Sequence, residues 1–114
     1  MDVEGKRVFL SGPMSAIEHY NVSAFAEAHA IVKEAGAYSV YNPAIEYLTK
    51  PSINEPHEYW MRYCIRMLAS EFPTNIDVLV SLPGWEDSVG ATLERTIALA
   101  CGIKVCELSE VGDA

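Results

Sequence analysis

The chain has 114 residues, 50% of them hydrophobic, and its 16 acidic side chains against 8 basic ones give a formal net charge of −8 at pH 7. This length and composition predict a single domain over residues 1–114, large enough to bury a core without disulfides or a metal. The acidic balance argues against a nucleic-acid polymer or an anionic membrane surface as partner, because both attract basic proteins.

The lack of a recognisable targeting signal, together with the cysteine usage, predicts a cytoplasmic protein. No apolar run is long enough to span a membrane, and the first ten residues lack the features of a signal peptide. The three cysteines, Cys64, Cys101 and Cys106, form no CxxC pair, so we expect reduced thiols. The histidines are not spaced to complete a zinc site with them, and we expect neither a metal nor an organic cofactor.

Short apolar runs alternate with helical segments along the chain. The runs that predict buried strands are 7–10, 38–41, 77–82 and 103–106, and a turn signal ends each of the first three. The segments with helical periodicity are 22–35, a stretch from near 56 to a break at 72–75, and 88–101. This βαβαβαβ order predicts an α/β fold with a parallel sheet covered on both faces.

The last helical segment contains a carboxylate, Glu94, at an informative position. At about 100° per residue, one apolar stripe defines the face expected to be buried: Val89, Leu93, Ile97 and Ala100. The outer face is expected to hold Ala91, Arg95 and Ala98. Glu94 falls at the edge of the buried stripe, where Gly90 leaves space beside it. Periodicity leaves two interpretations open: a carboxylate that enters a cleft, or a surface side chain that turns into water.

Ligands of parallel α/β sheets bind at the carboxyl ends of the strands. The residues expected there are Ser11, Gly12, Pro13 and Met14, then Asn42 and Pro43, and then 83–88. Ser88 and the backbone N–H groups of Val89 and Gly90 open a helix, which predicts an anion site that needs no lysine. Ser88 equally suits a plain N-cap. Trp85 is interpreted either as a lid over a base or as an ordinary exposed aromatic.

Four motifs resemble the DUF4406 family of the nucleoside 2-deoxyribosyltransferase-like superfamily, a family common in phages and bacteria. They are Val8–Met14 (VFLSGPM), Tyr20-Asn21, Asn42-Pro43 and Leu82–Glu94 (LPGWEDSVGATLE), and the resemblance covers most of residues 7–106. It implies a flavodoxin-like or Rossmann-like three-layer sandwich with four to five parallel strands, assembled as a homodimer or higher homo-oligomer. Characterised superfamily enzymes cleave or exchange the N-glycosidic bond of nucleosides or nucleoside 5′-monophosphates.

The resemblance also implies roles for individual residues. Glu94 matches the glutamate that attacks C1′ of the sugar. Ser88 matches a serine that contacts the 5′-phosphate in relatives acting on monophosphates, where relatives acting on free nucleosides have Asp. We therefore expect an N-glycosidase or transferase acting on a nucleoside 5′-monophosphate. The remaining expected contacts are Ser11, Gly12, Pro13 and Met14 on the sugar side, Gly90 at the phosphate, Asn42 nearby, and Trp85 or Tyr20 stacked on the base.

At two positions the sequence departs from the family pattern, and the residue that acts as general acid is therefore not identified. Cys64 stands where many relatives carry an Asp, and Phe9 stands where a tyrosine is common. The candidates for the general acid are Asp87, which we favour, Glu86 and Asp77, the last of which begins a strand and so belongs to the other end of the sheet. The alternative function is a nucleotide-binding or sequestering module without catalysis.

Overall fold

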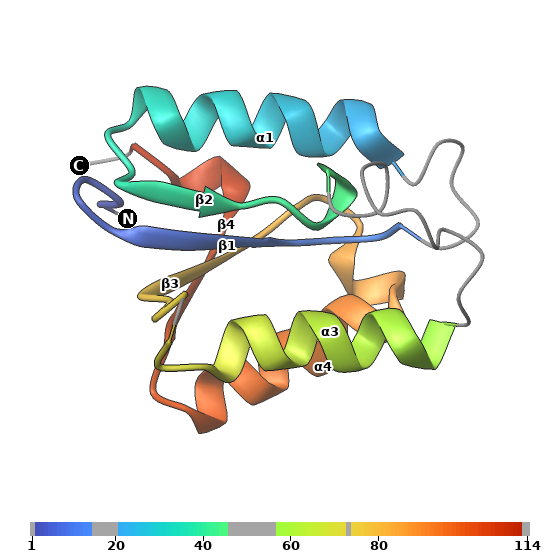
Figure 1. Cartoon of the computed structure of the whole chain (residues 1–114). Coiled ribbons are helices and arrows are strands. Elements are labelled where there is room, and N and C mark those ends of the chain that lie inside the picture. The colour runs from blue at the N-terminus through green and yellow to red at the C-terminus, as the bar shows by residue number, and fades with distance from the viewer. Residues whose placement is uncertain (1, 15–20, 46–56, 73, 113–114) are drawn as a thin grey trace.

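A computed structural model describes residues 2–14, 21–45, 57–72 and 74–112 (Figure 1). Their strands form one parallel sheet in the order β2-β1-β3-β4. The strands are β1 (Arg7–Ser11), β2 (Ser39–Tyr41), β3 (Val78–Ser81) and β4 (Lys104–Glu107). The helices are α1 (Val22–Glu34), α3 (His57–Ala69) and α4 (Val89–Ala100), with short 3-10 turns η2 (Trp85–Asp87) and η3 (Leu108–Glu110).

Helices cover both faces of the sheet. α1 lies on one face, while α3 and α4 lie side by side on the other (Figure 1). The predicted α/β fold is therefore confirmed, and the architecture is compatible with a flavodoxin-like three-layer sandwich. The predicted strands and helices fall within one to three residues of the observed bounds. Among the residues described, no helix is long and apolar enough to cross a membrane.

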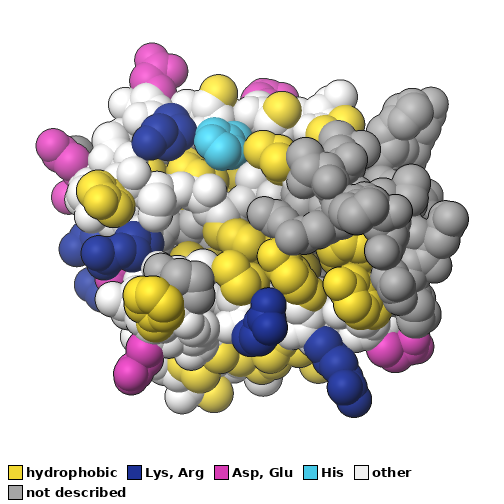
Figure 2. All heavy atoms as spheres, viewed as in Figure 1, with side chains coloured by type: hydrophobic (Ala, Val, Ile, Leu, Met, Phe, Trp, Pro, Cys, Tyr) yellow, Lys and Arg dark blue, Asp and Glu magenta, His cyan; other side chains and the backbone are white. Residues whose placement is uncertain are grey.

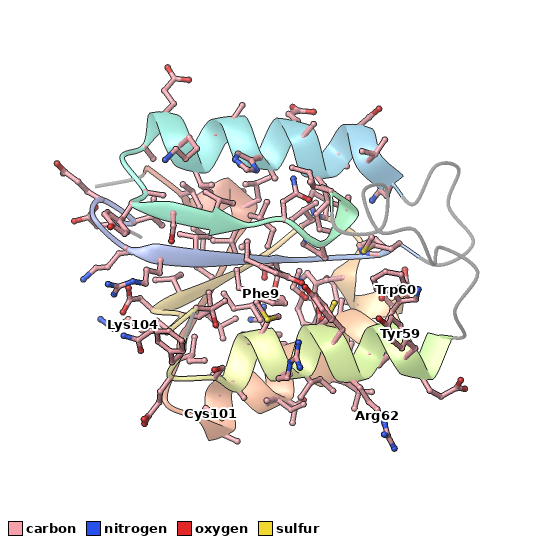
Figure 3. All side chains as sticks on the ribbon, viewed as in Figure 1. Phe9, Tyr59, Trp60, Arg62, Cys101 and Lys104 are labelled. Carbon is pink, nitrogen blue, oxygen red and sulfur yellow. The ribbon has the colours of Figure 1, made fainter. Side chains whose placement is uncertain are left out.

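The two central strands are buried on both sides, which explains their nearly continuous apolar runs. Successive side chains of a strand point to opposite faces. Accordingly Val8 and Leu10 pack under α1, whereas Phe9 packs against α3 and α4 (Figure 3). Complete burial of side chains of this size stabilises the fold by roughly 1.5–3 kcal/mol each.

The same alternation carries two serines to the face covered by α4. Ser11 ends β1 and is paired in register with Ser81, which ends β3. Ser11 Oγ donates to Glu94 Oε1 at 2.7 Å, and Ser81 Oγ accepts from Arg95 Nη1 at 3.0 Å. Two consecutive residues of α4 are thus tied to two neighbouring strand ends, which fixes the rotation of the helix about its own axis.

This rotation corrects the predicted orientation of α4. The buried residues of the helix are Ala91, Glu94 and Ala98, two of which were expected on the outer face. Val89 and Leu93 are 72% and 46% exposed, although the apolar stripe predicted their burial. The physical reason is that small side chains let α4 approach the sheet closely. The hydrogen bond that Glu94 accepts from Ser11 and the one that Arg95 donates to Ser81 hold the helix in that position. Neither the close approach nor these hydrogen bonds can be predicted from the apolar periodicity of the helix.

Candidate active site

A cleft of about 940 Å³ opens at the carboxyl end of the sheet. Its described walls come from the loop after β1, the start of α1, the first turns of α3 and the segment from β3 into α4. This is the edge where parallel sheets bind ligands, and the volume suits a small organic molecule. The predicted site residues that line it are Gly12, Pro13, Met14, Asp87, Ser88, Gly90 and Glu94.

Glu94 is a buried carboxyl group in the wall of this cleft. The residue is only 6% exposed, and Ser11, which is 1% exposed, lies behind it as a hydrogen-bond donor. Burial raises the pKa of Glu94 from 4.5 to about 7, and the Ser11 hydrogen bond works in the opposite direction. The carboxyl group therefore changes charge near neutral pH, which is typical of catalytic acids, bases and nucleophiles.

The close approach of two strand ends shapes one wall of the cleft. Gly12 follows β1 directly, and a Cβ atom there would lie 2.7 Å from Cβ of Leu82, which follows β3. Only glycine fits that gap, so the backbone turns sharply and presents Pro13 and Met14 to the cleft. The SGPM motif is thus explained by steric contact at the rim of the site.

Ser88 caps α4 at the edge of the cleft. Its Oγ accepts from the backbone N–H of Ala91 at 3.2 Å, which leaves the hydroxyl hydrogen free to be donated to a ligand. The N–H groups of Val89 and Gly90 belong to the first helical turn, where no intrahelical acceptor exists. The predicted N-cap is therefore confirmed, and the cap leaves donors at the same helix end that an anion could use. Within the described lining, the charged side chains are Asp87 and Glu94, both acidic.

The cleft has an apolar wall of which the sequence analysis singled out only Cys64, as the residue that stands where many relatives carry an Asp. Trp60, Met61 and Cys64 line it from α3, and Trp60 lies near the start of that helix (Figure 3). In the sequence Trp60 and Cys64 belong to a regular apolar stripe, which indicates core. The available signal was their position, because a helix that precedes a parallel strand begins at the carboxyl end of the sheet.

Asn42 was expected to contact substrate, but it lies outside the cleft lining. Its Nδ2 donates to the carbonyl oxygen of Phe25 at 3.4 Å and lies 3.3 Å from Nδ1 of His29. Its Oδ1 accepts from the N–H of Ala44 at 3.1 Å. These partners occupy the side chain, which ties the end of β2 to α1 and turns the chain at Asn42-Pro43.

Trp85 also lies outside the lining, on the far side of η2. Its ring lies under the guanidinium group of Arg95 at 4.2 Å, and its Nε1 donates to both carboxylate oxygens of Glu107 at 3.0 and 3.1 Å. Arg95 completes the triangle with an ion pair to Glu107 at 3.1 Å. We call Trp85, Arg95 and Glu107 the turn clamp. It holds η2 against β4, and the expectation that Trp85 stacks on a base is not supported by this position.

The other expected residues are placed as follows. Asp77 accepts from the backbone N–H of Arg7 at 2.9 Å at the opposite end of the sheet, as its position at a strand start implied. Glu86 is exposed on η2 and is absent from the described lining. Tyr20 lies outside the described residues. The described part of the chain holds no group of three His, Cys, Asp or Glu side chains that could bind a metal ion.

Comparison with known protein families identifies the family of this chain. Residues 6–107 match the family described as "Domain of unknown function (DUF4406)". The matched range begins just before β1 and ends with β4, so it includes the whole sheet and every described wall of the cleft. No curated protein matches the chain. The family description specifies no reaction, and a functional argument has to come from the chemistry of the cleft.

Proposed function

The chain belongs to the DUF4406 family, and on this premise we propose that it cleaves the N-glycosidic bond of a nucleoside 5′-monophosphate with Glu94 as nucleophile. The observation that carries the proposal is a buried carboxyl group in the cleft wall with a pKa of about 7 and a single serine donor behind it. Burying a carboxylate is costly, and a purely structural residue at this position would be apolar. The similarity of Leu82–Glu94 to the nucleoside 2-deoxyribosyltransferase-like superfamily supports the same chemistry.

The reaction follows the two steps of retaining glycosidases. A carboxylate oxygen of Glu94 forms a bond to C1′ while the C1′–N bond breaks and the electron pair leaves with the base. The base takes up a proton, and we assign its donor as Asp87, which is exposed and is the second carboxyl group of the described lining. Water, or an acceptor base in a transferase, then attacks C1′ and gives up a proton to Asp87, while the ester bond to Glu94 breaks and releases its carboxylate. Positive charge that develops on the sugar favours the ionised form of Glu94 in the transition state.

The phosphate is assigned to the first turn of α4. The Ser88 hydroxyl and the N–H groups of Val89 and Gly90 supply donors, and the helix dipole favours an anion at this end. A carboxylate at position 88 would repel a phosphate. The apolar wall formed by Trp60, Met61 and Cys64 then provides a surface for a base, in place of the role expected for Trp85.

A second candidate function is nucleotide binding without turnover. The observation that favours it is Cys64, which lines the cleft where many superfamily relatives carry an Asp. A thiol is a poor substitute for a carboxyl group in handling the sugar or the leaving base. A module of this kind would bind the same ligands and release no base.

The experiment that tests the proposal is an incubation of the protein with the ribo- and deoxyribonucleoside 5′-monophosphates and the matching free nucleosides. Released base is measured by chromatography, with Glu94→Gln as the test variant and Glu27→Gln, an exposed residue of α1, as the matched control. We expect base release from monophosphates, lost in Glu94→Gln and retained in Glu27→Gln. Absence of release with every substrate, while a nucleotide still raises the melting temperature, would instead favour the binding module.

A further inference from the structure

Arg95 follows the candidate nucleophile directly in α4, but it does not belong to the described lining of the cleft. Three other elements hold its guanidinium group. Nη1 donates to Ser81 Oγ at the end of β3 at 3.0 Å and to Glu107 Oε2 at the end of β4 at 3.1 Å. The group also covers the Trp85 ring of η2 at 4.2 Å. The side chain is 27% exposed, so these contacts are largely shielded from water.

This combination of contacts suits a guanidinium group. Its planar edge donates to acceptors while its face covers an aromatic ring, whereas a lysine ammonium group is a point charge without such a face. Glu107 is fixed as well, because its carboxylate accepts from Trp85 Nε1 and its backbone N–H donates to Glu110 Oε1 at 2.7 Å. The turn clamp is therefore a connected network, whereas an isolated surface ion pair would contribute little.

The turn clamp joins the two ends of the segment that carries the polar side chains of the proposed reaction. These side chains are Asp87, Ser88 and Glu94, and they lie between Trp85 and Arg95, whose side chains are in contact. The backbone N–H of Ser88 donates to the carbonyl oxygen of Trp85 at 3.0 Å. The assigned phosphate site is thus linked to one member of the clamp, and the candidate nucleophile is the neighbour of another.

The position of the phosphate donors is important because charge gives a phosphate little attraction to this cleft. Within the described lining the charged side chains are acidic. On the face shown in Figure 2, basic side chains gather toward the end of the sheet opposite the cleft and over α3. The assigned phosphate contacts are a hydroxyl and two backbone N–H groups, which act only at hydrogen-bond distance. Their placement relative to Glu94 decides whether a bound nucleotide presents C1′ to the carboxylate.

We propose that Arg95 is a positioning residue which, through Trp85 and Glu107, fixes the distance between the phosphate donors at Ser88 and the carboxyl group of Glu94. This inference rests on the proposed function. The sugar of a nucleoside 5′-monophosphate sets the span between its phosphate and C1′, so both ends engage together only where the protein holds a matching span. Reaction rates are sensitive to such placement, since a displacement of about 1 Å lowers a rate by on the order of 100-fold.

Arg95→Met tests the proposal by kinetics. It should lower kcat/KM for a nucleoside 5′-monophosphate by on the order of 100-fold, chiefly through kcat. The loss for the matching free nucleoside should be at least about tenfold smaller, because that substrate has no phosphate to be placed. The matched control is Arg62→Met, since Arg62 is exposed on α3 and points away from the body of the protein (Figure 3). It should leave both values unchanged.

Glu107→Gln provides a second, milder variant for the case in which Arg95→Met does not fold, as judged by circular dichroism. It removes the ion pair to Arg95 but keeps an acceptor for Trp85 Nε1. Its losses should be smaller than those of Arg95→Met and should again be larger for the monophosphate than for the free nucleoside.

Binding measured from backbone N–H signals in NMR titrations separates this inference from the proposed function. Inorganic phosphate needs only the first turn of α4, so Arg95→Met should change its Kd by less than about twofold. A nucleoside 5′-monophosphate needs both ends of the span, so its Kd should rise by on the order of tenfold. Neither titration needs turnover, and both therefore test the positioning role even if the wild type releases no base.

Four results would overturn the proposal. A folded Arg95→Met that keeps the wild-type preference for monophosphate over free nucleoside, in turnover or in binding, would show that the turn clamp only stabilises the fold. Equal weakening of inorganic phosphate would assign Arg95 to the phosphate site itself. The same losses in Arg62→Met would attribute the effect to removal of a positive charge in general. A wild type that binds neither phosphate nor nucleotide would overturn this inference together with the proposed function.

Discussion

Replacing Glu94 by glutamine should stabilise the protein at alkaline pH while removing its activity. Folding moves the carboxyl pKa from 4.5 to about 7 because the group is buried. Between these two values the folded state binds more protons than the unfolded state, so stability decreases as pH rises through the window and is constant above it. At pH 8 this difference between the two pKa values lowers the free energy of unfolding by roughly 3 kcal/mol. Glutamine removes the charge, and its amide oxygen can still accept the hydrogen bond from Ser11.

Thermal or urea unfolding of both proteins at pH 5 and pH 8 provides the assay. Other titrating groups are common to the two proteins and cancel in the difference between them. At pH 5 the two should have similar stability, and at pH 8 Glu94→Gln should unfold roughly 10 °C higher. The exposed control Glu27→Gln should show no such dependence on pH. If Glu94→Gln were equally or less stable than the wild type at pH 8, the carboxyl group would be neither desolvated nor ionised as we infer.

Further predictions concern the reaction and the turn clamp. If Glu94 is the nucleophile, kcat/KM should show a rising limb with a midpoint near pH 7, because only the ionised carboxylate attacks C1′, and a profile without that limb would contradict the assignment. Ser11→Ala removes the hydrogen bond that lowers the Glu94 pKa, so the rising limb of that pH profile should move to higher pH; an unmoved limb would refute the coupling. Ser88→Asp keeps a good N-cap but repels phosphate, and should reduce kcat/KM for a monophosphate by at least about tenfold more than for the free nucleoside. Trp85→Phe removes the donor to Glu107 and should cost about 1.5–3 kcal/mol of unfolding free energy; unchanged stability in urea would refute the turn clamp.

The fold could be predicted because the sequence patterns that indicate its strands and helices depend on neighbouring residues. The central strands are buried on both faces and therefore appear as short continuous apolar runs, and Gly36 and Gly102 end the helices before β2 and β4, both with positive φ. Ser88 and Glu94 could be placed at the strand ends because a βαβ unit brings every helix start to the same edge of the sheet.

The features that could not be predicted from the sequence depend on contacts between residues far apart in the chain. The orientation of α4 is set by Ser11 and Ser81, which lie far from it in the chain, and an apolar stripe does not reveal whether it faces the sheet or another surface. Trp60 has the spacing of a core residue, and only the assembled cleft shows that it also forms a wall of the site. Trp85 was assigned to the cleft because it lies on a strand-end loop, but Arg95 and Glu107 hold its ring on the other side.

The most direct test of the central claim is to look for the covalent intermediate. Protein mixed with a monophosphate substrate is quenched rapidly with acid, digested and analysed by mass spectrometry. We predict that base is released and that the sugar 5-phosphate is found as an ester on the peptide that contains Glu94, with both signals absent in Glu94→Gln. Release of base at the wild-type rate by Glu94→Gln, with no adduct on that peptide in either protein, would contradict the assignment of Glu94 as nucleophile.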